Sequence, residues 1–275
     1  MIPKNVPVMK YLLDKPSKLN GVAMFQPYFA RLEKHLIKIY QTGDKKSVKK
    51  TTKSSKTAVK KSTEKSLVKT TKSGGDYEDL IKAVNGMLPE GNIITRSKIC
   101  DSTGISVDTA DFIVSEKRFK GMELIFSEEM PVELVRGSYS ICQKVNRKQL
   151  VETLINVANC KKVGQYEKKN EPPFHASFVI AFDSTYQMDE LKKAVKEIYH
   201  ENSVDPRFEM DLMIVLGKGI VIKDWSKKGN YIALDTKEDS LMWFYIIMNE
   251  YLSLATSQDF DLRNYIRNPK VYDEF

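Results

Sequence analysis

Apolar positions change their spacing along the chain, and this spacing predicts which segments are helices and which are strands. Before residue 43 they recur every three or four residues, which indicates an amphipathic helix over Phe25–Tyr40. After residue 74, similar helical stripes alternate with short, continuously apolar runs that are typical of buried strands. This alternation predicts an α/β fold with a central mixed β-sheet flanked by helices.

The segments after residue 74 follow this alternation closely. Helices are expected at 77–88, 147–163, 188–201 and 240–256. Strands are expected within 92–115, the second of them at 110–115, and at 122–126, 133–145, 174–182 and 208–225. The last range holds two strands around Gly217-Lys218-Gly219. That turn lacks the GxxxxGK[ST] spacing of a phosphate-binding loop, so we interpret it as a tight hairpin.

Charge is distributed unevenly and divides the chain into three parts. Residues 43–75 contain 11 Lys, no Arg, one Asp and one Glu, so they carry a net charge of +9. The whole chain carries +8, and the remainder is therefore close to neutral at −1. We expect an N-terminal part at 1–42 whose helix packs on the main domain, a Lys-rich disordered tether at 43–75, and an α/β domain at 76–275.

The Lys-rich tether has two interpretations. It is either a solvated connection or a connection that also contacts phosphate backbones, because clustered lysines bind nucleic acid without sequence preference. An acidic protein partner is a further option for the same charge. The lysines that we expect to contact nucleic acid are Lys45, Lys46, Lys49, Lys50, Lys53, Lys56, Lys60 and Lys61.

Other features of the composition exclude several classes of protein. No run of about 18 apolar residues occurs, so we expect no membrane span. The first residues lack the apolar core of a signal peptide. Three isolated cysteines and three histidines predict neither a zinc site nor a disulfide framework, and a reducing cytoplasm is the expected location.

Three motifs follow one another after the tether. They are "GGDYEDLIKAVNGMLP", "CDSTGISVDTADFIV" and "PVELVRGSYSICQKVN", and a Leu-containing helix comes next. Their order resembles an uncharacterised bacterial domain family of the PD-(D/E)XK, or restriction-endonuclease-like, nuclease superfamily. Members of that family have "G-x-x-x-E-x-x-L…LP", "D-x-x-G-x-x-S-x-x-x-D-I-V-I" and "P-V-E-G-V-Y-A-V-I-E-V-K-S". The resemblance covers roughly residues 24–41 and 74–266 and implies a restriction-endonuclease-like fold.

The resemblance also implies roles for individual residues. In the superfamily, an aspartate and a glutamate bind Mg²⁺, a lysine orients or activates the attacking water, and an upstream helix glutamate often completes the site. Carried over by position, the helix glutamate is Glu78 and the metal-binding aspartate is Asp111. Carboxylate oxygens are the ligands that Mg²⁺ prefers, and the ion activates water for phosphodiester hydrolysis.

The third motif departs from the family pattern. Without a gap, the glutamate falls on Gln143 and the lysine on Val145. A shift by one residue makes Lys144 the lysine but puts Cys142 in place of the glutamate, and it turns every neighbouring side chain to the other face of the strand. Neither register contains the complete motif, so the resemblance implies an eroded active site.

Structural explanations remain open for each of these residues. Glu78 also fits a first-turn acid favoured by the helix dipole, and Gln143 and Lys144 also fit ordinary edge residues. Asp111 also fits a turn residue, with Asp108 as the alternative acid. Cys142 has no recognisable base or acid beside it and fits a small buried residue.

Three functions are compatible with these features of the sequence. The main hypothesis is a catalytically weak or inactive nuclease-like domain that binds nucleic acid or protein and needs no cofactor. The alternative is an active Mg²⁺-dependent endonuclease that uses Glu78, Asp111 and a migrated lysine, Lys144. The second alternative is a structural or interaction protein that acts through its Lys-rich tether.

Overall fold

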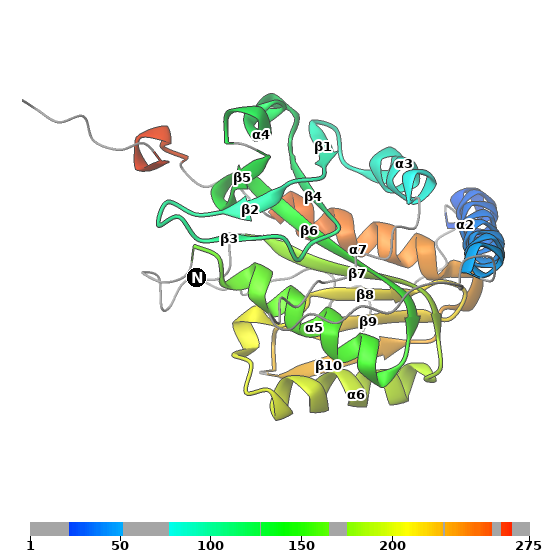
Figure 1. Cartoon of the computed structure of the whole chain (residues 1–275). Coiled ribbons are helices and arrows are strands. Elements are labelled where there is room, and N and C mark those ends of the chain that lie inside the picture. The colour runs from blue at the N-terminus through cyan, green and yellow to red at the C-terminus, as the bar shows by residue number, and fades with distance from the viewer. Residues whose placement is uncertain are drawn as a thin grey trace, which may run out of the picture.

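The computed structural model describes residues 22–51, 77–126, 128–164, 175–227, 229–254 and 260–265. For residues 22–25, 42–51, 123, 254, 263 and 264 it describes the backbone only. Within these ranges, a seven-stranded sheet forms the centre of the protein, and helices cover both of its faces (Figure 1). The predicted α/β fold with a central mixed sheet is confirmed.

The central sheet has the strand order β1-β4-β6-β7-β8-β9-β10. Strands β6, β7 and β8 are parallel to one another, whereas the pairs β1–β4, β4–β6, β8–β9 and β9–β10 are antiparallel. The strands are β1 (Asn92–Thr95), β4 (Phe112–Glu116), β6 (Val135–Val145), β7 (Ala176–Ser184), β8 (Leu212–Val215), β9 (Gly219–Asp224) and β10 (Asn230–Leu234).

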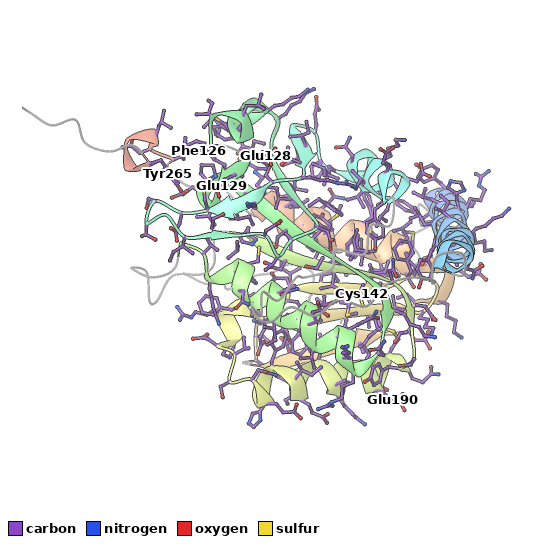
Figure 2. All side chains as sticks on the ribbon, in the orientation of Figure 1. Phe126, Glu128, Glu129, Cys142, Glu190 and Tyr265 are labelled. Atoms are coloured by element: carbon purple, nitrogen blue, oxygen red, sulfur yellow. The ribbon has the colours of Figure 1, made fainter. Side chains whose placement is uncertain are left out.

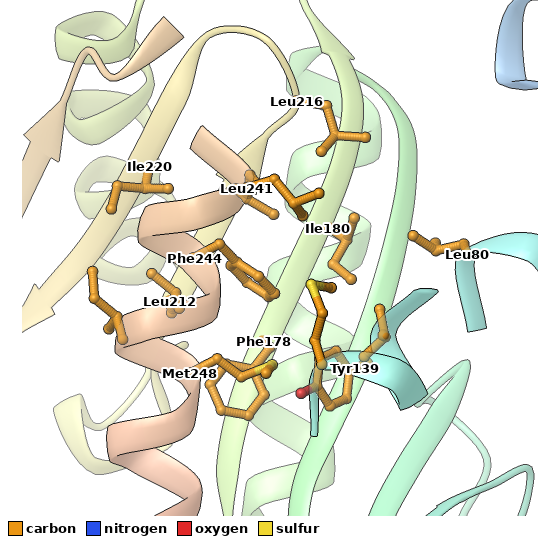
Figure 3. Close-up of a cluster of buried hydrophobic side chains, with 14 of the residues drawn as sticks. Leu80, Tyr139, Phe178, Ile180, Leu212, Leu216, Ile220, Leu241, Phe244 and Met248 are labelled. Atoms are coloured by element: carbon orange, nitrogen blue, oxygen red, sulfur yellow. The ribbon is translucent and has the colours of Figure 1, made fainter. Parts of the chain in front are cut away.

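Two layers of helices enclose this sheet. One face is covered by α2 (Val22–Thr51), α3 (Glu78–Met87) and α7 (Ser240–Leu254), and the other by α5 (Arg147–Lys162) and α6 (Met188–Glu201). Figure 3 shows Leu241, Phe244 and Met248 of α7 beside the sheet residues Phe178, Ile180 and Leu212. Because helices cover both faces, the middle of β7 is continuously apolar from Phe178 to Phe182, as the sequence pattern predicts.

Local signals in the sequence explain where the second helix layer begins. Helix α5 starts after Asn146, whose side chain accepts a hydrogen bond from the Gln149 amide at 3.0 Å. Helix α6 starts with a capping box between Gln187 and Glu190. These caps satisfy amide groups that have no partner inside the helix, so both helices begin where the sequence predicts.

The predicted hairpin around Gly217-Lys218-Gly219 joins β8 and β9. Gly217 has a φ of +72°, a conformation that side chains with a Cβ rarely adopt. At Gly219 a Cβ would come within 2.1 Å of the Leu234 carbonyl oxygen. Both glycines are therefore required by the backbone, and the hairpin presents Lys218 at a defined place.

The structure differs from the sequence prediction in several elements. The predicted strand at 122–126 is wrong, because Met122–Ile125 forms a short helix, α4, after Gly121 in the left-handed region. Its Leu124 and Ile125 side chains are 81% and 67% exposed, so the apolar run is not a buried strand. The sequence pattern did not indicate β10 or a separate sheet of β2 (Lys98–Cys100), β3 (Ser106–Val107) and β5 (Glu129–Pro131), with the order β3-β2-β5.

Helix α2 packs on the main domain through Phe29 and Leu36, which are buried in the same core as α7. The helix continues to Thr51, beyond the predicted end at Tyr40, and lysine is compatible with this because it is a good helix former. The rest of the Lys-rich segment lies outside the described residues. In the part of the chain that the structure covers, no helix is sufficiently long and apolar to cross a membrane.

One buried carboxyl group connects α2 to the sheet. The Glu33 side chain is 2% exposed, and its Oε1 accepts a hydrogen bond from the Gly217 amide at 2.6 Å. Burial raises the pKa of Glu33 from 4.5 to about 7, although the hydrogen bonds from the Gly217 and Leu241 amides oppose this shift. Nearby Asp239 and Glu238 raise the pKa further.

This carboxyl group predicts a pH-dependent contribution to stability. The native state keeps the Glu33 proton up to a pH of about 7, whereas the unfolded state releases it near pH 4.5. The stability of the native chain should therefore fall as the pH rises through this window. We expect Glu33→Gln to remove this dependence. Relative to the native chain, the free energy of unfolding of the variant should therefore rise by about 3 kcal/mol between pH 4.5 and pH 7.5.

Urea denaturation at a series of pH values measures this difference. The exposed Glu201 of α6, which does not act on Glu33, provides the control, and Glu201→Gln should follow the native pH profile closely. If the stability of Glu33→Gln and that of the native chain change with pH in parallel, Glu33 is not the source of the pH dependence.

Candidate active site

Strand β6 presents alternate side chains to the two helix layers. Tyr139 and Ile141 belong to the core under α3 and α7. Cys142 belongs to the core under α5 and α6. Since neighbouring side chains of a strand point to opposite faces, the placement of these residues decides which motif residues can act together.

Gln143 lies on the α3 face of the sheet. Its Nε2 donates a hydrogen bond to the Tyr77 hydroxyl at 3.2 Å, and Tyr77 directly precedes α3. Val145 is fully buried in the α5–α6 core. The ungapped register of the family motif would therefore put its glutamate on the α3 face and its lysine inside the protein.

Asp111 lies on the opposite face from Gln143. The next residue, Phe112, stacks on Tyr139 with ring centroids 4.6 Å apart on the α7 side, so Asp111 points to the α5 side. Its amide donates to the Tyr139 carbonyl at 2.8 Å, and its Oδ2 accepts from the Ile141 amide at 2.6 Å. These bonds fix the exposed Asp111 side chain against the edge of β6.

Cys142 lies on the sheet face that α5 and α6 cover, and Figure 2 labels it in the middle of the protein beside the sheet. Its thiol forms a hydrogen bond with the Thr153 side chain of α5. Burial raises the pKa of the Cys142 thiol to about 11, and the negative charges of Glu152 and Asp111 raise it further. The group is therefore a neutral thiol at physiological pH, and it supplies no negative charge.

Lys144 projects from the same face as Cys142. The two residues pair in register with Asp183 and Ala181 of β7, respectively, Ala181 and Cys142 both belong to the α5–α6 core, and Lys144 forms an ion pair with Asp183. The Lys144 side chain is 54% exposed, and its Nζ lies 3.9 Å from Asp183 Oδ2 on the neighbouring strand β7. Asp183 also pairs with Lys218 of the hairpin, at 3.3 Å. The face that carries Asp111 therefore carries Lys144 as well.

Glu78 occupies a different position from these residues. It is the first residue of α3, which covers the opposite face of the sheet, and its carboxylate lies 3.7 Å from Lys82 Nζ. Asp108, the alternative acid, is exposed in the segment before β4. Among the described side chains, no three of His, Cys, Asp or Glu are grouped so that they could hold a metal ion.

Comparisons with known proteins identify the fold. No family model and no curated protein matches the chain. Among solved structures, NucC from P. aeruginosa ATCC27853 in its cAAA-bound form is similar, with a TM-score of 0.60, 11% identity, and coverage of 87% of this chain and 95% of NucC. The fold is restriction-endonuclease-like.

NucC from E. coli MS115-1 is similar in two forms. The apo form has a TM-score of 0.57 and 16% identity and covers 70% of this chain and 90% of NucC. The cAAA-bound form has a TM-score of 0.54 and 14% identity, and the match covers 68% of this chain and 81% of NucC. At these identities the likeness is one of fold alone.

Sequence reasoning missed several residues around Cys142 and Lys144. Thr153 and Glu152 lie in a helix whose pattern indicates only packing, and Asp183 and Lys218 lie about 40 and 70 residues after Lys144. Only the pairing of β6 with β7 and the position of the hairpin bring the last two to Lys144. No spacing in the sequence indicates this proximity.

The state of the cysteines predicts their reactivity. All three are free and buried, and burial raises the pKa of Cys100 to about 12 and those of Cys142 and Cys160 to about 11. At pH 8 only about one in a thousand thiols with such a pKa is ionised, and the thiolate is the reactive form. We expect no fast reaction of the native chain with Ellman's reagent.

Denaturation provides the internal control for this measurement. In guanidinium chloride all three thiols should react within the mixing phase. A fast thiol in the native chain, mapped by mass spectrometry to Cys142, would show that the thiol is accessible or ionised and would contradict its description as a neutral buried group.

Proposed function

We propose that this chain is a Mg²⁺-dependent endonuclease of the PD-(D/E)XK type, in which Lys144 is the catalytic lysine. One observation carries the proposal. Asp111 and Lys144 project from the same face of the β4–β6 pair within a fold that is restriction-endonuclease-like. The register of the motif that makes Lys144 the lysine therefore puts that lysine on the same face as Asp111.

The residues of this face fit a divalent cation in part. Asp111 offers a hard oxygen ligand, but the neutral Cys142 thiol does not suit Mg²⁺. Glu152 is the further carboxylate whose charge acts on Cys142, so we propose that Asp111 and Glu152 would hold the ion. A bound ion would neutralise phosphate oxygens and lower the pKa of a water molecule.

The protein side chains contribute orientation and positive charge. The hydrogen bond from the Ile141 amide orients Asp111 before any substrate arrives. The ammonium group of Lys144 is on the exposed part of this face, where it can donate to a non-bridging phosphate oxygen and stabilise the charge that develops during hydrolysis. Gln143 and Val145 take no part, because one faces α3 and the other is buried.

A second candidate function is a nuclease-like module that binds nucleic acid or protein without cleaving it. The thiol at position 142, where the superfamily pattern has a metal-binding acid, favours this candidate. In both cases we propose that the Lys-rich segment, residues 43–75, contacts phosphate backbones through its +9 charge. An acidic protein is the alternative partner for that segment.

Cleavage assays separate the two candidates. We expect the native chain to cleave plasmid or single-stranded DNA with Mg²⁺ or Mn²⁺, and we expect Asp111→Ala and Lys144→Ala each to lower the rate about a hundredfold or more. Gln143→Ala is the control and should cleave like the native chain. Each arm is run with and without cAAA, because two of the similar NucC structures contain it.

Absence of cleavage by the native chain in every arm would contradict the endonuclease proposal and would favour the binding module. An equal loss of cleavage rate in Gln143→Ala and Lys144→Ala would instead contradict the assignment of the catalytic residues to the face that carries Asp111 and Lys144.

Restoring a carboxylate tests the same face through binding. In Cys142→Glu the new carboxylate would be exposed to the charges of Asp111 and Glu152, so the variant should be less stable than the native chain without metal and should bind Mg²⁺. We expect saturating Mg²⁺ to raise the Tm of Cys142→Glu by about 4 °C or more.

The matched control is Gln143→Glu, which adds the same side chain one position away on the α3 face. Its Tm should change with Mg²⁺ no more than that of the native chain. A larger Mg²⁺ effect in Gln143→Glu than in Cys142→Glu would mean that the other register forms the site.

A further inference from the structure

Asp183 lies between two lysines at the carboxyl end of the β6–β7 pair. Its Oδ2 is 3.9 Å from Lys144 Nζ, and its Oδ1 is 3.3 Å from Lys218 Nζ. The three side chains are 54%, 45% and 39% exposed for Lys144, Asp183 and Lys218, so all of them contact solvent. One carboxylate is thus shared by two ammonium groups, and the cluster retains a net charge of +1.

The position of Lys218 is determined by the backbone around it. Its Nζ donates to the Ser184 carbonyl oxygen, directly after Asp183 in β7. The hairpin that carries it is fixed by the steric requirement at Gly219 and by the bond from the Gly217 amide to Glu33 of α2. Lys218 is therefore held at Asp183 by contacts to β7, β10 and α2, whereas Lys144 has one long contact there.

We propose that Lys218 is a positioning residue for Lys144. Lys218 occupies one oxygen of Asp183 and offsets its charge, so Asp183 holds Lys144 only loosely and the Lys144 ammonium remains available to a phosphate group. Among the ion pairs of the described residues, Asp183 pairs with Lys144 and Lys218. If Lys218 is removed, Lys144 is the lysine that remains at Asp183, and the two side chains form a neutral pair. This inference rests on the proposed nuclease function for its catalytic consequence, but not for the contact itself.

The arrangement differs from a surface ion pair with a structural role only. If Lys218 merely stabilised the hairpin, removal of Asp183 would add to the damage caused by removal of Lys218. If Lys218 acts by occupying Asp183, removal of Asp183 reverses that damage, since nothing then draws Lys144 away. The double variant Lys218→Met with Asp183→Asn distinguishes these cases.

The first experiment compares cleavage rates of the full-length variants under saturating and limiting DNA. We expect Lys218→Met to lower kcat roughly two- to fivefold, which is the range that partly exposed charge pairs supply. Asp183→Asn and the double variant should cleave at least as fast as the native chain. The control is Lys192→Met, which removes one lysine from a surface pair at 3.2 Å on α6 and should leave kcat unchanged.

The second experiment does not depend on cleavage. Lys144 is acetylated by a water-soluble acylating reagent, and its labelling rate is followed by mass spectrometry. A lysine side chain held against a carboxylate is less accessible to the reagent, so Lys218→Met should slow labelling of Lys144 about two- to fivefold. Asp183→Asn and the double variant should label Lys144 faster than the native chain does.

The outcomes separate this inference from the proposed function. Changes in labelling as described, with no cleavage by any variant, support the positioning role and contradict the nuclease function. Cleavage that depends on Lys144, with labelling of Lys144 unaffected by Lys218→Met, overturns the positioning role alone. A double variant as slow as Lys218→Met in both experiments also overturns it, because Lys218 then acts independently of Asp183.

Discussion

The alternation of side chains along β6 is the constraint on which the rest of the structure depends. This strand pairs with β4 on one side and β7 on the other, and it separates the core under α3 and α7 from the core under α5 and α6. A shift of one residue would exchange the two sets of side chains. Packing on both faces therefore fixes the register, and the register places Asp111 and Lys144 on the face that lacks Gln143.

Charged groups at the two ends of the sheet have opposite characters. At one end, Lys161 pairs with Asp211 at 2.7 Å and Lys223 with Glu209 at 3.3 Å, and all four side chains are buried. Burial and the charge of Lys161 lower the pKa of Lys223 to about 8, although Asp211 and Glu209 oppose this shift. Each charge there is compensated by a partner, and burial keeps all four side chains away from solvent.

The exposed end, around Lys144, Asp183 and Lys218, is not compensated in this way. Two ammonium groups share one carboxylate, and water reaches all three. Such an arrangement costs little stability and leaves a positive charge for a phosphate group. The contrast explains why we assign a structural role to the buried charges and a functional role to the exposed ones.

The sequence by itself determined most of the elements, because the period of apolar residues differs between helices and strands and does not depend on distant residues. Helices α5, α6 and α7 and strands β6–β9 follow it. It failed at Met122–Ile125, where the apolar residues are exposed, and at β10 and the small sheet, whose short strands depend on their partners. For the site it indicated Asp111 and Lys144 but left two registers open, since a motif contains no record of which face a residue takes. Only the tertiary structure decided that Gln143 contacts Tyr77, that the charges of Asp111 and Glu152 act on Cys142, and that Lys218 reaches Asp183, because these interactions join residues from separate strands and helices.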